Sequence, residues 1–237
     1  MTDIFKNILQ NAAHYESLSA HDILNDIMTK LGHAVVQANS LGAEDVVILH
    51  MMHDIDPAFK SFTLYTGRLN PETYDVLGRL QEKYQLDIEI LFPEREAIEK
   101  MVQEKGINLF YESGENRQLC CQVRKVEPLS RVLKKYSGWI CGLRREQSPT
   151  RSAVSVIEKD DAHGGMLKIN PLAHWTRAEV WDYIQKNAIP YNRLFDQGYA
   201  SIGCAPCTRA IKAGEDERSG RWWWEDSNSK ECGLHKS

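Results

Sequence analysis

The sequence predicts an α/β fold with a mostly parallel sheet flanked by helices, followed by an irregular C-terminal extension. Short apolar runs rich in β-branched residues alternate with helical patterns, which is the rhythm of strands joined by crossover helices. The 237 residues suffice for one sizeable hydrophobic core. From Ile189 onward, glycine and proline interrupt any long element. We therefore expect an α/β body over 1–188 and an extension of the same domain over 189–237.

The first elements follow from periodicity, a cap and an apolar run. Helically spaced apolar residues over 19–39 predict a helix, which Ser19 caps together with Asp22. The run "DVVILH" (45–50) is short, apolar and rich in β-branched residues, so it predicts a buried strand. The small, glycine-containing turn "SLGAED" (40–45) would then join that helix to that strand.

Helix-start signals place the later elements. Asn70 with Pro71 is typical of a helix start, and Thr176 with Glu179 forms a capping box. The later elements are expected as a strand over 61–65, a helix over 70–84, a strand over 87–92, a helix over 93–105 stopped by Gly106, a helix near 121–135, a strand over 138–143 and a helix from Thr176 to Asn187.

Composition limits the classes of function. The formal net charge is -4, so no overall basic field points to nucleic acid or to a membrane surface. The start "MTDIFKNILQ" lacks the pattern of a secretory signal, and no stretch reaches the length of a membrane-spanning helix. We therefore expect a cytoplasmic protein. In that reducing compartment, the six cysteines indicate metal binding or redox chemistry rather than a disulfide framework.

Two polar turns lie beside predicted strands. "SLGAED" and "TGRLNPET" (66–73) can offer backbone N–H groups to a phosphate or sulfate, and ligands of open parallel sheets collect beyond the carboxyl ends of the strands. An ordinary loop is the simpler interpretation of either turn alone, and neither matches the pattern GxxxxGK[ST]. The candidate binding residues are Ser40, Leu41, Gly42, Thr66, Gly67 and Arg68.

Two cysteine pairs carry the most specific signal. Cys120 and Cys121 are adjacent, and Cys204 with Cys207 forms a CxxC motif. Four thiolates suit zinc or an iron–sulfur cluster. A structural zinc site more usually has two spaced CxxC motifs, whereas adjacent cysteines can take separate corners of an iron–sulfur cube. This favours a [4Fe–4S] cluster over zinc and over a coincidence of buried cysteines, while Cys141 is expected to be a small buried apolar residue.

Basic residues are concentrated around both cysteine pairs. They lie in Gly-, Ser- and Cys-rich segments, and guanidinium groups bind phosphate and sulfate through paired hydrogen bonds. Solvated surface charge explains any single one, but together they favour a small, multiply charged anion over nucleic acid. The tryptophans at 222–224 are expected to pin the extension to the body, with base stacking as the alternative. The basic residues are Arg124, Lys125, Arg131, Arg144, Arg145, Arg151, Arg209, Arg218 and Arg221.

The segment "ECGLH" places Cys232 near His235. A thiolate close to His235 and to Arg218 or Arg221 would have a lowered pKa and would be nucleophilic. A free surface thiol is the alternative for a lone cysteine near a chain end.

The motifs "SLGAED", "TGRLNPET", "CC–RK–PL–R", "GLRREQS–TR", "CAPCTR" and "ECGLH" occur together in this order. The chain resembles the assimilatory adenylyl-sulfate reductases, which are related to phosphoadenylyl-sulfate (PAPS) reductases, roughly from Ser40 to His235. The resemblance implies an adenine nucleotide alpha hydrolase-like (PP-loop) fold and a [4Fe–4S] cluster on the four paired cysteines. The PAPS branch lacks those cysteines, so the resemblance favours adenosine 5′-phosphosulfate (APS) as substrate. Tyr65 departs from the family pattern, which commonly has aspartate before "TGRL" at the adenosine end of the pocket.

The resemblance also implies roles for individual residues. The two early turns would hold the adenylate, and Lys125, Arg218, Arg221 and His235 match family positions near the phosphosulfate. The thiolate of Cys232 would attack the sulfate sulfur, release AMP and carry an S-sulfonate. An external dithiol, thioredoxin or a similar protein, would then release sulfite.

Other functions stay open at this point. PAPS could be the substrate, or the chain could be an iron–sulfur or zinc PP-loop enzyme that activates a nucleobase with ATP. A non-catalytic, zinc-stabilised binding module is a third class. The oligomeric state is also open, with a homo-oligomer as one outcome.

Overall fold

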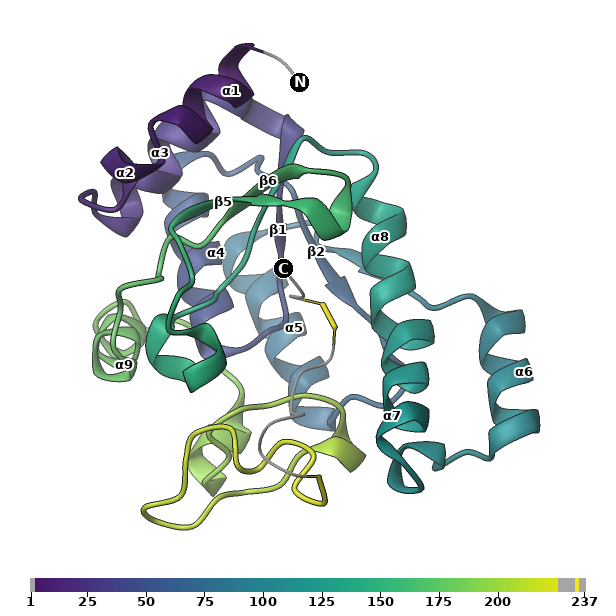
Figure 1. The fold of residues 1–237 in the computed structure, drawn as a ribbon. Coiled ribbons are helices and arrows are strands. Elements are labelled where there is room, and N and C mark those ends of the chain that lie inside the picture. The colour runs from purple at the N-terminus through teal and green to yellow at the C-terminus, as the bar shows by residue number, and fades with distance from the viewer. Residues whose placement is uncertain (1–2, 226–232, 235–237) are drawn as a thin grey trace.

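A computed structural model describes residues 3–225 and 233–234. Its described residues form one six-stranded sheet in the order β3-β2-β1-β4-β6-β5, parallel except for the antiparallel pairing of β5 with β6 (Figure 1). The strands are β1 (Val35–Ala38), β2 (Ser61–Leu64), β3 (Glu89–Leu91), β4 (Gly138–Ile140), β5 (Ile157–Asp160) and β6 (Met166–Ile169). The predicted fold class is confirmed.

Helices cover both faces of this sheet. The helices are α1 (Asp3–Gln10), α2 (Ala12–Tyr15), α3 (Ala20–Leu31), α4 (Ala43–Ile55), α5 (Pro71–Tyr84), α6 (Arg95–Lys105), α7 (Gly114–Cys121), α8 (Glu127–Leu133) and α9 (Arg177–Lys186). Successive residues of β1 face opposite sides. Val35 joins the core shared with α1, α3, α4, α5 and α9, whereas Val36 packs in the layer under α8. The sheet is therefore buried on both faces, as expected for parallel strands.

One predicted strand is wrong. The run 45–50 lies inside α4, of which eight of thirteen residues are buried, because this helix packs against both α3 and α9. A helix that is apolar on nearly all sides loses the 3.6-residue pattern by which it could be distinguished from a buried strand. The predicted helix over 19–39 is wrong at its end, since α3 stops before Gly32 (φ +50°) and residues 35–38 form β1. The loop at Ser40 therefore follows a strand and opens a helix.

The predicted strands 61–65, 87–92 and 138–143 contain β2, β3 and β4, and the local capping and stop signals below are also confirmed. Ser19 accepts a hydrogen bond from the Asp22 amide, and Thr176 with Glu179 forms the expected reciprocal box. Gly106 ends α6 with φ +81°. Strands β5 and β6 have no counterpart among the predicted elements.

The extension contains only short 3-10 turns and a bridge within its described part. These turns are Arg193–Gln197 and Ala205–Cys207, and Thr208 bridges Arg221. The division at residue 188 stays a prediction. None of the helices in the described part of the chain is both long enough and apolar enough to cross a lipid bilayer.

Candidate active site

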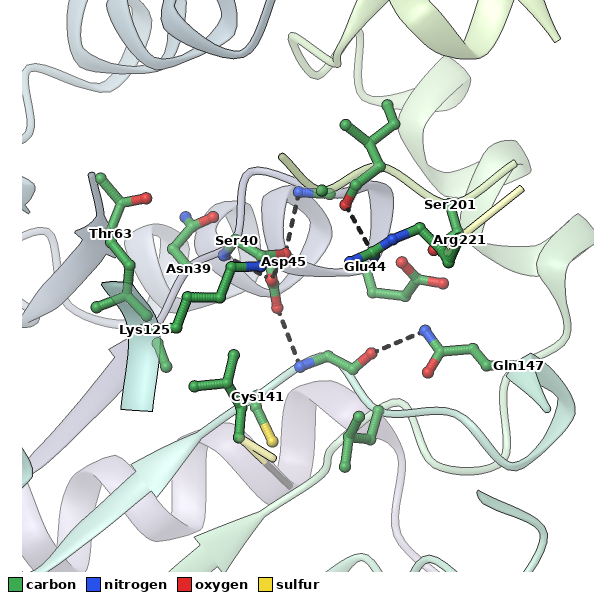
Figure 2. A pocket seen from close by; sticks show the side chains of 18 of the residues that line it. Asn39, Ser40, Glu44, Asp45, Thr63, Lys125, Cys141, Gln147, Ser201 and Arg221 are labelled. Carbon is green, nitrogen blue, oxygen red and sulfur yellow. Dashed lines mark hydrogen bonds between the residues drawn. The ribbon is translucent and has the colours of Figure 1, made fainter. Parts of the chain in front are cut away.

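A cavity of about 200 Å³ lies at the carboxyl ends of β1, β2 and β4, with the extension as its other wall. This is the edge where open α/β sheets bind ligands. Both polar turns predicted to bind an anion contribute to it, and four cationic side chains also line it. Two of these cations, Lys125 and Arg221, are labelled in Figure 2. The predicted residues in its lining are Ser40, Gly42, Thr66, Lys125, Arg151, Arg218 and Arg221.

The floor of the cavity is organised by Asp45, in the first turn of α4. Its carboxylate accepts hydrogen bonds from the amide of Ser40 (2.8 Å), the hydroxyl of Ser40 (2.5 Å) and the amide of Gly142 (3.0 Å). Figure 2 shows this carboxylate bridging the loop after β1 and the chain after β4. Burial raises the pKa of Asp45 to about 6, although these hydrogen bonds oppose the shift. One side chain thus ties together two loops from neighbouring strands.

Gln147 fixes the loop that follows β4. Its amide nitrogen donates to the carbonyl of Gly142 (3.1 Å), and its oxygen accepts from the amide of Arg144 (3.2 Å). The same oxygen accepts from Nη1 of Arg151 (2.6 Å), a residue of the cavity lining. The backbone between these residues is therefore cross-linked at the cavity edge.

Lys125 and Arg221 connect this cavity to a second one beside it, since both line the two cavities. Lys125 lies in a π-turn (Gln122–Val126) between α7 and α8. Arg221 donates Nη1 to the carbonyl of Ile202 (3.4 Å), and its guanidinium lies 4.6 Å from the ring centroid of Trp222. In Figure 2 these two cations come from different elements toward the same space.

The second cavity, which we call the cysteine cavity, is lined by Cys120, Cys121, Cys204 and Cys207. All four side chains are buried, and all four are unbridged thiols. Cys204 Sγ lies 3.3 Å from the hydroxyl oxygen of Thr66. The predicted convergence of the two cysteine pairs is thus seen in the fold.

Three of the four thiols have a shifted pKa, and the shifts differ in direction. Burial opposes ionisation of Cys204, but Lys125, the Thr66 hydroxyl and Arg221 together hold its pKa below the usual range. Burial raises the pKa of Cys207 to about 12 and also raises that of Cys120. Ionising the whole set therefore requires further positive charge in the cysteine cavity.

Buried donors around the cysteine cavity lack acceptors. Nε of Arg124, Nε of Arg221 and Nε1 of Trp222 have no hydrogen-bond partner among the described residues. Acceptors inside the cavity would satisfy them. Across 3–225 and 233–234, no three His, Cys, Asp or Glu side chains are placed to hold one metal ion. The arrangement could instead hold a larger group with several attachment points, which brings positive charge for the thiolates and acceptor atoms for these donors.

The structure places the other predicted binding residues outside the lining of the first cavity. Arg68 lines the cysteine cavity and bonds to the Ile107 carbonyl (2.7 Å). Arg145 bonds to the Val154 carbonyl (2.7 Å) and to Glu16 (2.8 Å). The remaining three are Leu41, buried at φ +63°, Gly67, at φ +73° beside Arg124, and Arg144, buried among carboxylates.

The two predicted catalytic residues near the chain end, Cys232 and His235, lie outside the described residues. Leu234 is described. It lines the first cavity and packs against the apolar layer that contains Phe62, Leu129 and Trp139.

Sequence reasoning missed the acidic and amide side chains of the cavity. Glu44, Asp45, Gln147 and Glu217 all line it. The only signal was the position of Glu44 and Asp45 just after a glycine turn, where acidic residues usually cap a helix dipole.

Fold and cavity together define an α/β protein of the PP-loop type, with an anion-binding site at the carboxyl edge of its sheet. Residues 34–210 match the phosphoadenosine phosphosulfate reductase domain family, and the chain belongs to that family. The adenosine 5′-phosphosulfate reductase of Burkholderia cepacia is 49% identical over 198 residues, which are 84% of this chain and 79% of that protein. The 5′-adenylylsulfate reductase 3 of Arabidopsis thaliana is 42% identical over 233 residues, which are 95% of this chain but 50% of that protein.

Solved structures agree with this fold. The phosphoadenylyl-sulfate reductase of Candida auris, in a phosphate complex, has a TM-score of 0.74 and 29% identity, covering 89% of this chain and 98% of that one. The FMN adenylyltransferase of Candida glabrata has a TM-score of 0.55 and 14% identity, covering 97% of this chain and 83% of that one, so it shares the fold alone.

Proposed function

We propose that this protein reduces APS to sulfite and AMP in sulfate assimilation, through an S-sulfonate on Cys232. The observation that carries the proposal is the pairing of a strand-end cavity with Lys125, Arg151, Arg218 and Arg221 in its wall. Relatives that are 47–49% identical are named adenosine 5′-phosphosulfate reductases. Such a cavity suits a nucleotide that carries two adjacent anionic groups.

The loop after β1 would hold the adenylate. Asp45 keeps the Ser40 amide in place, so the loop is formed before substrate arrives. Thr66, after β2, lines the first cavity. Its hydroxyl oxygen also lies 3.3 Å from the Cys204 thiol. On this proposal, the nucleotide end of the substrate would lie against the sheet and its phosphosulfate toward the extension.

Lys125, Arg218 and Arg221 would bind the phosphosulfate. Their positive charge offsets the negative charge that develops on AMP as it leaves, and a water-poor site strengthens that effect. Both Lys125 and Arg221 also face the cysteine cavity, so charge in one cavity is felt in the other.

The chemistry would proceed by two displacements at sulfur centres. The Cys232 thiolate attacks the sulfate sulfur, the sulfur–oxygen bond to the phosphate breaks, and AMP leaves with the electron pair. His235 would favour the thiolate. A thiolate of an external protein dithiol, such as thioredoxin, then attacks the Cys232 sulfur and expels sulfite. The second thiol of the reductant closes its disulfide and returns Cys232, so the dithiol supplies the two electrons. We place this reaction in the cytoplasm, where such dithiols stay reduced.

A [4Fe–4S] cluster fits the cysteine cavity, with Cys120, Cys121, Cys204 and Cys207 as ligands. The four thiols share one cavity, but no three of them are set for a single ion, and unpartnered buried donors surround them. A cluster there would supply positive iron charge next to the phosphosulfate site. Lys125 would transmit that field, because it lines both cavities.

The nucleophile is tested with APS labelled in its sulfur and no reductant present. We expect the native enzyme to retain one label per chain and to release it as sulfite when a dithiol is added. The Cys232→Ser variant should bind AMP and retain no label. The Cys141→Ser variant is the matched control, since its hydroxyl can keep the bond of Cys141 Sγ to Asn170 (3.0 Å). A covalent label on Cys232→Ser would overturn the assignment.

The substrate is tested separately. We expect kcat/KM for APS to exceed that for PAPS, in line with the names of the more similar relatives. A higher kcat/KM for PAPS would transfer the proposal to the substrate of the Candida auris relative.

A further inference from the structure

Arg144 is a buried cation surrounded by carboxylates, with a side chain only 1% exposed. Its Nε lies 2.7 Å from an oxygen of Glu44, and its Nη2 lies 3.2 Å from an oxygen of Glu217. Its Nη1 reaches Glu146 (3.3 Å) and the carbonyl of Trp175 (3.4 Å). Its hydrogen-bonding groups are therefore engaged by protein, which explains why a residue expected to bind substrate lies outside the cavity lining.

One of these carboxylates belongs to a distinct segment of the extension. We call residues 208–221 the arginine hairpin. Its ends, Thr208 and Arg221, form an antiparallel bridge, and it contains Arg209, Arg218 and Arg221. Immediately after it, the amide of Trp222 donates to the carbonyl of Cys207 (3.2 Å). The base of the hairpin is therefore attached to the CxxC segment.

Away from that base, Glu217 reaches Arg144 in the loop after β4, and Arg144 in turn reaches Glu44 in α4. The next residue, Arg218, lines the first cavity. Because neighbouring residues share one backbone, a contact that fixes Glu217 also limits where Arg218 can lie. Burial, together with the nearby Glu44 carboxylate, raises the pKa of Glu217, and the positive charge of Arg144 opposes that shift.

We propose that Arg144 and Glu217 are positioning residues that tie the arginine hairpin to the first turn of α4, beside the loop after β1, and so hold Arg218 at the phosphosulfate end of the cavity. The proposal rests on the proposed function, because it assigns the hairpin a role in binding APS. Neither residue is assigned contact with the substrate.

A simpler role for Glu217 predicts the opposite result. If its carboxylate only adds negative charge to the wall of an anion site, removing that charge strengthens binding of an anionic substrate. If it positions Arg218 through Arg144, removing the charge weakens binding despite the more favourable electrostatics. The sign of the change therefore distinguishes the two roles.

The test compares Glu217→Gln with Glu215→Gln. Glu215 lies in the same hairpin and pairs with Arg209 (3.0 Å), but it is not part of the cavity lining. For Glu217→Gln we expect KM for APS and Kd for AMP to rise about tenfold, because a charged hydrogen bond is worth about that factor in affinity. The value of kcat should change far less. Glu215→Gln should leave both constants near the native values. An unchanged or lower KM for Glu217→Gln would overturn the proposal.

Arg144→Lys provides the second measurement. Lysine keeps the charge but cannot bridge two carboxylates with a planar fork. We expect Arg144→Lys to raise KM for APS as well. The double variant with Glu217→Gln should have a KM no higher than that of the single variant with the higher KM. Additive effects would show that the two residues act separately. Iron content and Tm of each variant show whether it has folded. If the native protein bound no AMP, the proposed function itself would be refuted.

Discussion

The sheet wall and the extension wall of the cavity are held in place by different means. In the sheet wall, the loops after β1 and β4 continue from paired strands, and Asp45 joins them through backbone amides. In the extension wall, the arginine hairpin is closed by a bridge at its base, and side-chain pairs such as Glu217 with Arg144 connect it to the body. Where regular pairing ends, individual side chains take over the positioning. Single substitutions should therefore have larger functional effects in the extension wall.

The largest effect is expected from Cys204→Ser, which removes a proposed cluster ligand from the extension wall. Iron content should fall from about four per chain to near zero, and turnover should fall about 10³-fold or more, because the field behind the anion site is lost. Iron analysis and steady-state assays measure this. Cys141→Ser should keep both. A Cys204→Ser protein with full iron would show that the extension wall is held without the cysteines.

Lys125→Gln should have the next largest effect, since this side chain faces both cavities. We expect kcat/KM for APS to fall by about 10²- to 10³-fold, the usual loss for one preorganised cationic or donor group. Lys135→Gln is the matched control, because Lys135 is exposed and pairs with Glu89 (3.3 Å). Equal activity of the two variants would remove Lys125 from the site.

Asp45→Asn tests the sheet wall through pH. Folding raises the pKa of Asp45 to about 6 from an ordinary value of 3.8, so between those values the folded state binds the extra proton. Stability contributed by Asp45 is therefore greatest below pH 4 and declines as pH rises through 6. We expect the unfolding free energy of the native protein, relative to Asp45→Asn, to fall by about 3 kcal/mol over this window. Denaturant titrations across pH measure it, and a constant difference would contradict the buried, ionising carboxylate.

Gly203→Ala should have the smallest functional effect of the variants in the extension wall, because it displaces a cation without removing it. An added Cβ would lie 2.4 Å from Nη2 of Arg221, so the guanidinium must move away from Gly203 and leave its present position in the cavity lining. We expect KM for APS to rise about tenfold, which is the value of one charged contact. Gly78→Ala, in open space on α5, should instead leave KM unchanged and add about 0.5–1 kcal/mol of stability. If both variants had native KM values, Arg221 would not depend on this close approach.

The sequence predicted the fold class and the convergence of the two cysteine pairs, but it misassigned individual elements. The two cysteine pairs could be recognised because thiol chemistry is carried by residue type, and the fold confirms that they share a cavity. The run 45–50 was misassigned because α4 is apolar on nearly all sides, and β1 was hidden because it follows α3 after only a short turn. Burial from two sides removes the periodicity on which such a prediction depends.

Arginines show a second limit of sequence reasoning. Arg144 and Arg151 lie in the same basic segment, yet one is enclosed by Glu44 and Glu217 and the other lines the cavity. The local sequence does not name all the partners of a guanidinium, because two of the three carboxylates that engage Arg144 come from residues 100 positions before it and 73 after it, and only Glu146 is close in sequence. Asp45 was missed for the same reason, since its partner at Gly142 is 97 positions away.

The π-turn over Gln122–Val126 makes the site depend on the number of residues as well as on their identity. A π-turn holds more residues per turn than an α-turn, so it changes the direction in which every following side chain points. Here it directs Arg124 to the carbonyl of Thr66 (2.7 Å) and leaves Lys125 facing both cavities. Loss of one residue from this turn would restore a regular helix and rotate Lys125 by about 100° relative to Cys121. The spacing between the cysteine pair and the lysine is therefore itself a functional parameter, which substitutions that preserve chain length do not test.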